Sequence, residues 1–266
     1  MSVRVAVAQT APRIGDVDHN LGEVEELAAG LAGRMDLLVL PELFTTGYRR
    51  LGMDHAALAE PIPEGPSLAR LSRLAASTDL TLIGTLLEAA DGRVYDTAVV
   101  IGPDGKVTAT YRKTHLYPAE RAHFAPGDRL VTATAAGLRI GLAICFEHAF
   151  PEIFTELALA GAQLVAIPSA VPVGFEYLLD LRTRARAQDN QLYVAAANLV
   201  GFDGESRWCG ASMIVGPRGE VLARAGGEQP ELIESAIDPA AIEGERAQEP
   251  ALINRRPDLY SRLRST

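Results

Sequence analysis

The chain contains one pattern twice, as VVIGPDGKVTATY at residues 99–111 and as MIVGPRGEVLARA at residues 213–225. In each copy, a Gly-Pro-x-Gly turn lies between two apolar runs. Proline presets φ for such a turn and glycine tolerates positive φ, so each copy predicts a β-hairpin. Any α/β protein can contain two such hairpins. A chain built from two similar halves would also contain them, and this second interpretation predicts two mixed sheets packed face to face, with helices outside.

Outside the hairpins, apolar β-branched runs alternate with stretches of helical spacing, which is typical of an α/β protein. We find no linker, low-complexity stretch or change of composition, so residues 1–266 are expected to form one domain. The expected strands cover residues 3–8, 37–41, 80–87, 97–101, 107–111, 139–145, 164–168, 193–197, 211–215, 221–225 and 232–237. The expected helices cover residues 20–32, 66–78, 151–160, 175–190 and 257–263.

The amino-acid composition limits the classes of protein to which this chain can belong. With 48% hydrophobic and 22% charged residues, the chain can bury a sizeable core. No apolar run approaches the length of a membrane helix, and the N-terminus lacks the layout of a signal peptide, which predicts a soluble cytoplasmic protein. The net charge of -9 and the scattered arginines argue against nucleic-acid or membrane partners and favour a small molecule. Two cysteines are too few for a disulfide framework or a thiolate metal site.

Three reactive side chains each follow an expected strand. Glu42 ends the apolar run before it, where a carboxylate is either solvated or partly desolvated with a raised pKa. Lys113 also follows a strand, a place from which lysine usually points to water. Cys145 lies between a strand and a helix that Pro151 can begin, and this geometry exposes a nucleophile beside backbone N–H groups. Cys209 is expected to be a buried structural thiol.

Together, a base, a cation and a thiol make a workable hydrolase set. The glutamate would take the thiol proton, the lysine would stabilise an oxyanion and the thiolate would attack. The spacing of four further candidate ligands matches no known metal-site signature, so no metal is expected. These candidate ligands are His115, Glu120, His123 and Asp128.

Seven segments, in order along the whole chain, resemble the nitrilase superfamily of carbon–nitrogen hydrolases. They are VAVAQ from Val5, LPELFTTGY around Glu42, YRKTHLYPAER around Lys113, AICFEHAFPE around Cys145, RAQDNQLYVAAANLVG from Arg186, CGASMIVGPRGEV from Cys209 and RRPDLY from Arg255. The resemblance implies a four-layer α-β-β-α sandwich, a homodimer or larger homo-oligomer, and no cofactor. It also assigns catalytic roles. Glu42 would be the general base, Lys113 the oxyanion-stabilising cation and Cys145 the nucleophile, with Glu120 as a second glutamate and the Phe146 N–H in the oxyanion hole.

The resemblance leaves the substrate open. The chain ends soon after RRPDLY, and this short C-terminus favours the amidase and carbamoylase branches over the nitrile-cleaving ones. The turn CFEHAFPE departs from the omega-amidase pattern. The loop at residues 169–190 is expected to form an apolar pocket wall, which favours a small apolar or aromatic amide; Arg182, Arg184 and Arg186 would instead suit a substrate carboxylate. Carbamoyl or nitrile hydrolysis and a catalytically silent binding subunit remain alternatives. The residues expected to bind substrate are Tyr48, Phe146, Glu147, His148, Ser169, Ala170 and Phe175.

Overall fold

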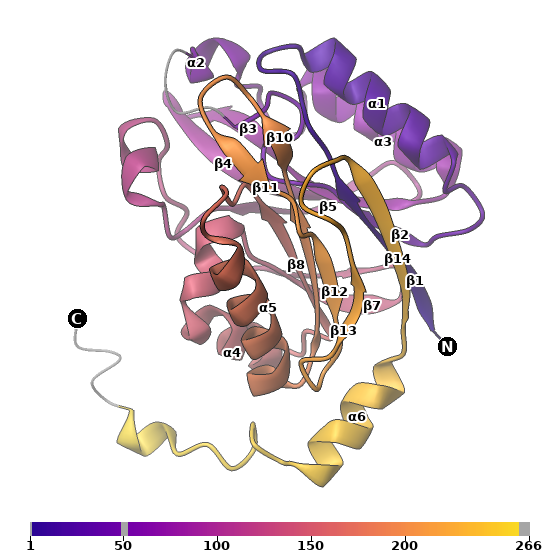
Figure 1. Cartoon of the computed structure of the whole chain (residues 1–266), viewed down its shortest axis with the longest axis vertical. Helices are drawn as coiled ribbons and strands as arrows, with labels where there is room; N and C mark the ends of the chain where they lie inside the picture. Colours follow the sequence, from indigo (N-terminus) through magenta and orange to yellow (C-terminus); the bar gives the residue numbers. More distant parts are fainter. Residues whose placement is uncertain (1, 49–52, 261–266) are drawn as a thin grey trace.

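The computed structural model describes residues 2–48 and 53–260, and it shows two β-sheets packed face to face, with helices on both outer faces (Figure 1). Apolar side chains fill the space between the sheets and the space between each sheet and its helices. The chain therefore forms the four-layer α-β-β-α sandwich of two mixed sheets that the sequence predicted. No helix in the described ranges is long and apolar enough to cross a membrane.

The first sheet consists of β1 (Val3–Gln9), β2 (Leu37–Val39), β3 (Thr81–Ala90), β4 (Arg93–Ile101), β5 (Val107–Arg112) and β14 (Glu231–Ile237). Its order is β14-β1-β2-β3-β4-β5. The strands β1, β2 and β3 are parallel, while β4 and β5 form the first expected hairpin. Residues of β1, β2 and β3 are almost all buried, as expected for parallel strands covered on both faces.

The second sheet consists of β6 (Thr132–Ala135), β7 (Leu138–Leu142), β8 (Leu164–Ser169), β9 (Tyr193–Asn198), β12 (Met213–Val215) and β13 (Val221–Arg224). Its order is β13-β12-β9-β8-β7-β6, with β7, β8 and β9 parallel and β12–β13 as the second expected hairpin. Each half therefore contains three parallel strands followed by one hairpin. This repeat confirms the two-fold interpretation of the similar segments.

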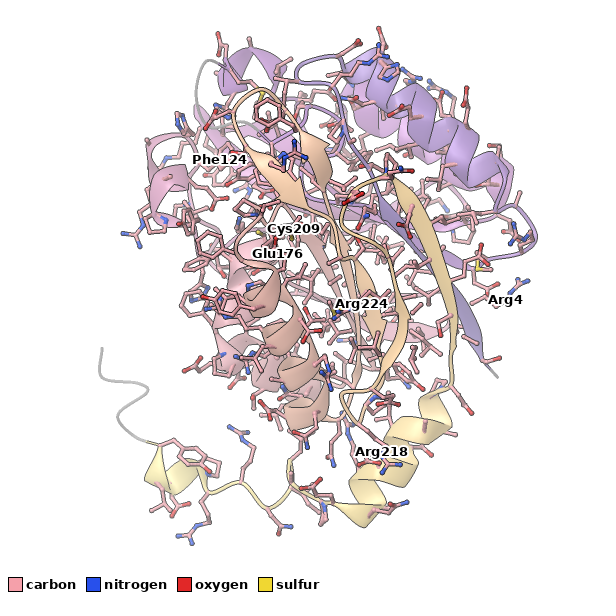
Figure 2. All side chains as sticks on the ribbon, viewed as in Figure 1. Arg4, Phe124, Glu176, Cys209, Arg218 and Arg224 are labelled. Carbon is pink, nitrogen blue, oxygen red and sulfur yellow. The ribbon has the colours of Figure 1, made fainter. Side chains whose placement is uncertain are left out.

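Four helices form the outer layers: α1 (Val17–Ala29), α3 (Pro66–Thr78), α4 (Pro151–Leu159) and α5 (Glu176–Asn190). Local signals set their ends. Asp16 caps α1 through the His19 N–H, and prolines occupy the first positions of α3 and α4. Charged side chains also pair at the surface. Arg224 of β13 pairs with Asp180 of α5, which joins a sheet to a helix, and Arg4 of β1 pairs with Asp36, directly before β2. Figure 2 labels the two arginines.

The predicted strands and the four long helices are present, with some differences. Elements that were not expected are α2 (His55–Leu58), β10 (Val200–Phe202), β11 (Arg207–Cys209), β6 and α6 (Pro239–Gln248). In α6 only Ile242 is buried, so the helix has almost no apolar periodicity to reveal it. The expected final helix is a 3-10 turn, Pro257–Leu259; residues 261–263 of that prediction lie outside the described residues.

Candidate active site

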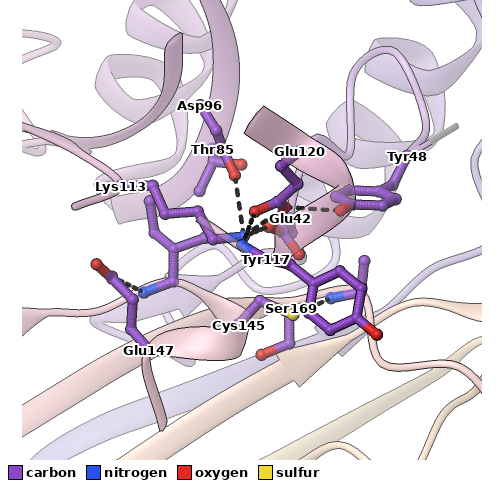
Figure 3. A network of polar contacts seen from close by, with 12 residues as sticks. Glu42, Tyr48, Thr85, Asp96, Lys113, Tyr117, Glu120, Cys145, Glu147 and Ser169 are labelled. Carbon is purple, nitrogen blue, oxygen red and sulfur yellow. Dashed lines mark hydrogen bonds and ion pairs between the residues drawn. The ribbon is translucent and has the colours of Figure 1, made fainter. Parts of the chain in front are cut away.

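The three reactive residues predicted from strand ends lie close together in space (Figure 3). Glu42 follows β2, Lys113 follows β5, and Cys145 begins the 3-10 turn η2 (Cys145–Ala149) after β7. A fourth residue, Glu120, comes from the 3-10 turn η1 (Pro118–Ala122). The two sheets thus each contribute strand ends to one cluster of side chains.

The ammonium of Lys113 lies at the centre of this cluster. Its Nζ is 2.6 Å from Oε1 of Glu42 and 2.6 Å from Oε1 of Glu120. Lys113 and Glu42 have no solvent exposure. Burial by itself lowers the pKa of Lys113, but the charges of Glu42 and Glu120 outweigh burial and raise that pKa well above its ordinary value. The lysine is therefore a fixed positive charge.

Glu120 is held by three hydrogen bonds. Its Oε1 accepts from Lys113 Nζ and from the Tyr48 hydroxyl, and its Oε2 accepts from the Tyr117 N–H, each at 2.6 Å. A carboxylate with three donors is well satisfied in its ionised form. Glu120 thereby fixes the position of the lysine and joins it to Tyr48, which lines the neighbouring pocket.

Glu42 sits on a tightly packed loop after β2. Its backbone N–H lies 3.4 Å from the carbonyl of Ser169 at the end of β8. Phe44 packs so closely on β3 that a Cβ at Gly84 would lie 2.6 Å from Phe44 Cε1. Burial raises the pKa of Glu42, with Lys113 acting in the opposite direction. A carboxylate with a raised pKa is suited to accept a proton and later return it.

Cys145 adopts a backbone conformation that side-chain-bearing residues rarely take. Its φ is 44°, in the left-handed region, at the sharp turn between β7 and η2. The Ala170 N–H points at Sγ from 3.5 Å. Burial and the charge of Glu42 raise the pKa of the thiol well above its usual value, whereas Lys113 and the Ala170 N–H lower it. The resting residue is a thiol that needs a base.

A cavity of about 400 Å³ opens beside Cys145. Five of the expected substrate-binding residues line it: Tyr48, Phe146, His148, Ala170 and Phe175. Val171, Pro172, Leu178 and Arg182, from the segment 169–190 that was expected to form the wall, line it as well. The sequence analysis missed Tyr117, Ser206 and Trp208. Most of these side chains are aromatic or aliphatic, so the predicted apolar wall is present.

The other two expected substrate-binding residues, Glu147 and Ser169, are not among the described residues that line the cavity. Glu147 is fully buried and points away from it. Its Oε1 accepts from the Tyr111 hydroxyl at 2.7 Å and the Thr114 N–H at 2.8 Å, and its Oε2 accepts from the Ile144 N–H at 2.7 Å. Glu147 therefore ties the segment after Lys113 to the residue before Cys145 and is not part of the cavity wall.

Ser169 is likewise a support for the site. Its hydroxyl bonds the Ile167 carbonyl at 3.2 Å, and its own carbonyl accepts from Glu42 and Leu199. Cys209, expected to be structural, is buried, with its Sγ 3.2 Å from Nδ2 of Asn198.

Of the three arginines considered for a substrate carboxylate, Arg182 lines the cavity. Arg184 bonds the Gly219 carbonyl, and Arg186 bonds the carbonyl of His148. Arg182 Nη1 lies 3.1 Å from Nε2 of His148. Burial, followed by the charges of Arg182 and Arg186, lowers the pKa of His148 to about 3. His148 is therefore neutral, and its Nε2 accepts a hydrogen bond from Arg182.

The residues considered as metal ligands from sequence do not come together. The one group of His, Cys, Asp and Glu side chains that clusters closely in the described residues is Glu42, Asp96 and Glu120. These three carboxyls surround the Lys113 ammonium. Asp96, within β4, was missed because one polar residue in an apolar strand gives no sequence signal of its own.

Known proteins share both sequence and structure with this chain. The profile of the carbon–nitrogen hydrolase family matches residues 4–247. An (R)-stereoselective amidase from a Pseudomonas species is 36% identical over 228 residues, which is 85% of this chain and 82% of the amidase. The human omega-amidase NIT2 is 36% identical over 242 residues, or 85% of this chain and 84% of that protein.

Solved structures give the same result. A Xanthomonas campestris protein of the CN-hydrolase superfamily, with an arsenic adduct in its active site, superposes with a TM-score of 0.89 at 26% identity, over 96% of this chain and 98% of that one. A Nesterenkonia amidase superposes with a TM-score of 0.86 at 28% identity, over 98% and 96% of the two chains. This chain belongs to the carbon–nitrogen hydrolase family of the nitrilase superfamily.

Proposed function

We propose that the protein hydrolyses the C–N bond of a small non-peptide amide through a thioester on Cys145, releasing ammonia and a carboxylic acid. One observation carries the proposal: a thiol at the wall of an apolar cavity shares its buried surroundings with a carboxylate and an ammonium 2.6 Å apart. Cys145 is a protonated thiol because its pKa is raised, and Glu42 is a carboxylate whose pKa is also raised. Lys113 keeps its positive charge because its pKa is raised. Acyl transfer needs a nucleophile, a base and an oxyanion partner of this kind.

In the first half-reaction, Glu42 takes the proton from the Cys145 thiol as Sγ attacks the amide carbon. The oxyanion is stabilised by the Lys113 ammonium and by the Phe146 N–H. The tetrahedral intermediate collapses as Glu42 gives its proton to the leaving nitrogen, so ammonia departs and a thioester remains. In the second half-reaction, Glu42 takes a proton from water, which attacks the thioester. Glu42 then returns that proton to the departing sulfur, and the acid is released.

Three relatives support this chemistry. A Pseudomonas relative is named as an amidase, and a human one as an omega-amidase. A variant of the Nesterenkonia amidase shows covalent addition of the acetamide moiety of fluoroacetamide at its active-site cysteine. Cys145, at the turn after β7 beside the cavity, is the residue that would form such an adduct in this protein.

The cavity favours a small apolar or aromatic amide, because Tyr48, Phe146, Phe175 and Trp208 form much of its wall. Arg182 supports a second candidate, an amide or N-carbamoyl compound that also carries a carboxylate. It is a cation on the same wall, and its one side-chain partner in the described residues is the neutral His148. A partly buried guanidinium of this kind suits a bidentate carboxylate.

The first test measures ammonia release from neutral aliphatic and aromatic amides, amino-acid amides, carboxylate-bearing omega-amides, N-carbamoyl compounds and matching nitriles. Cys145→Ala is the control, with thermal unfolding to show that it remains folded. We expect release from at least one amide class and none from the control. A preference for carboxylate-bearing substrates would select the second candidate over the first. Release that persists in Cys145→Ala, or from no amide at all, would overturn the proposal.

A further inference from the structure

Asp96 is a buried acid that has no role in the proposed amide hydrolysis as described so far. It lies on β4 with no solvent exposure, and in the described part of the chain neither of its carboxyl oxygens has a hydrogen-bond donor. The nearest cation is Lys113, whose Nζ is 3.8 Å from Oδ2 of Asp96, beyond hydrogen-bonding distance (Figure 3). An ionised carboxylate left without donors in such a place is strongly unfavourable.

The charges of the cluster show that one carboxyl holds a proton. Oxygen atoms of Glu42, Asp96 and Glu120 lie within 4.8 Å of one another, and the single ammonium of Lys113 lies among them. Three carboxylates and one ammonium would leave a surplus of two negative charges on side chains that have almost no solvent exposure. Like charges at this separation do not all ionise, so at least one carboxyl is neutral.

Hydrogen bonds identify which carboxyl is neutral. Glu120 accepts three, and Glu42 Oε1 accepts one from Lys113, so both are stabilised as anions. Asp96 accepts none. Burial, and after it the charge of Glu42, raise the pKa of Asp96 well above its ordinary value.

The proposed base, Glu42, also has one oxygen that lacks a hydrogen-bond donor within the described ranges. Glu42 Oε2 is buried and has no hydrogen-bond partner in the described residues. An Asp96 that carries a proton has an O–H to donate, and the Glu42 carboxylate has an oxygen to receive it. The two unsatisfied groups therefore satisfy each other once Asp96 is protonated.

We propose that Asp96 is a positioning residue: it remains a neutral carboxylic acid and donates a hydrogen bond to Glu42, which keeps that carboxylate ionised and aimed at Cys145. Asp96 keeps its proton through both half-reactions, so it changes no proton balance. The other charged or titratable groups that act on Asp96 are Lys113 from the end of β5 and Glu120 from η1. Glu88 of the adjacent strand is engaged by Arg112 and Thr97 instead.

The test compares Asp96→Asn with Asp96→Leu. Asparagine is neutral and can still donate to Glu42, so we expect kcat within about threefold of wild type and an unmoved acidic limb of the pH profile of kcat/KM. Leucine cannot donate, so we expect kcat to fall about tenfold or more. Its acidic limb should move to higher pH, because Glu42 loses a hydrogen bond to its charged form. Asp104→Asn, in the exposed turn of the same hairpin, is the matched control.

A spectroscopic measurement makes the test independent of turnover and of the leucine variant's folding. The infrared difference spectrum of wild type minus Asp96→Asn at pH 7 should contain the C=O band of a protonated carboxylic acid, absent when Asp104→Asn is subtracted. The kinetic arm rests on the proposed amide hydrolysis; the infrared arm does not. An ionised Asp96 would show no such band, and its replacement by asparagine would shift the acidic limb to lower pH. Either result overturns the proposal.

Discussion

At the scale of single residues, the site depends on how neighbouring charges set the proton affinity of one thiol. Burial raises the pKa of Cys145, and the negative charge of Glu42 raises it further. Lys113 acts in the opposite direction from within the same cluster. The carboxylate therefore suppresses the free thiolate while remaining the group that can accept its proton. This arrangement couples formation of the nucleophile to attack on a bound substrate.

Glu42→Gln separates these two effects. We expect kcat to fall by at least about 10²-fold, the scale of a lost general base. Cys145 should nevertheless stay reactive toward an alkylating amide such as iodoacetamide, because removing the negative charge lowers the thiol pKa while Lys113 remains. Mass spectrometry of the modified protein and steady-state ammonia release measure the two quantities. Wild-type turnover in this variant would remove Glu42 from the role of base.

At the scale of elements, the reactive side chains are positioned by ties between strand ends. Glu147 receives donors from the segment after β5 and from Ile144 after β7, so one buried carboxylate fixes the spacing of the lysine and the cysteine. Burial raises the pKa of Glu147, but its hydrogen bonds with His115, Thr114, Tyr111 and Ile144 outweigh burial and lower that pKa. Glu147 also holds Ile144, the residue directly before the left-handed Cys145.

Glu147→Gln tests this tie. The amide places an N–H₂ among N–H and O–H donors, so at least one buried donor loses its acceptor, at a cost of about 1–3 kcal/mol. We expect the free energy of unfolding to fall by that amount in urea titrations, and kcat to fall because both reactive residues shift. Glu152→Gln, on the exposed first turn of α4, is the control. Unchanged stability together with unchanged kcat would show that the tie is unimportant.

The sequence predicted these elements unevenly, for physical reasons. Strands such as β8 are largely apolar runs, and Glu42 and Cys145 stand out because each ends such a run, whereas Lys113 stands out because it follows an expected strand. The sequence pattern does not show in which direction a side chain points from a 3-10 turn. Glu147, two residues after Cys145, was therefore expected in the cavity and points away from it.

Sequence patterns also fail to identify site residues that lie within a regular strand or helix. Asp96 is one polar residue in a buried strand, and its proximity to Glu42 depends on how β4 lies against the loop after β2. Helical periodicity separates Arg182 from Arg184, because residues two apart face opposite sides of α5. Spacing alone could not say which side faces the cavity.

At the scale of the whole molecule, the buried site also makes stability depend on pH. His148 is buried, and its pKa falls from 6.5 to about 3 on folding. Below pH 6.5 the unfolded chain binds a proton at this residue that the folded chain does not, so folding loses stability as the pH falls from 6.5 toward 3. The loss reaches about 2 kcal/mol between pH 7 and pH 5.

Comparison with His148→Gln isolates this contribution, because the other titrating groups are common to both proteins. Glutamine takes up no proton in either state, so we expect its unfolding free energy in urea to decline less than that of wild type between pH 7 and pH 5, by about 2 kcal/mol. Equal slopes for wild type and His148→Gln would mean that His148 is protonated in the folded protein. In that case the hydrogen bond from Arg182 could not form, since both partners would be donors, and the cavity wall beside Cys145 would carry two positive charges. The same measurement therefore also checks the electrostatic basis for placing a carboxylate-bearing substrate against Arg182.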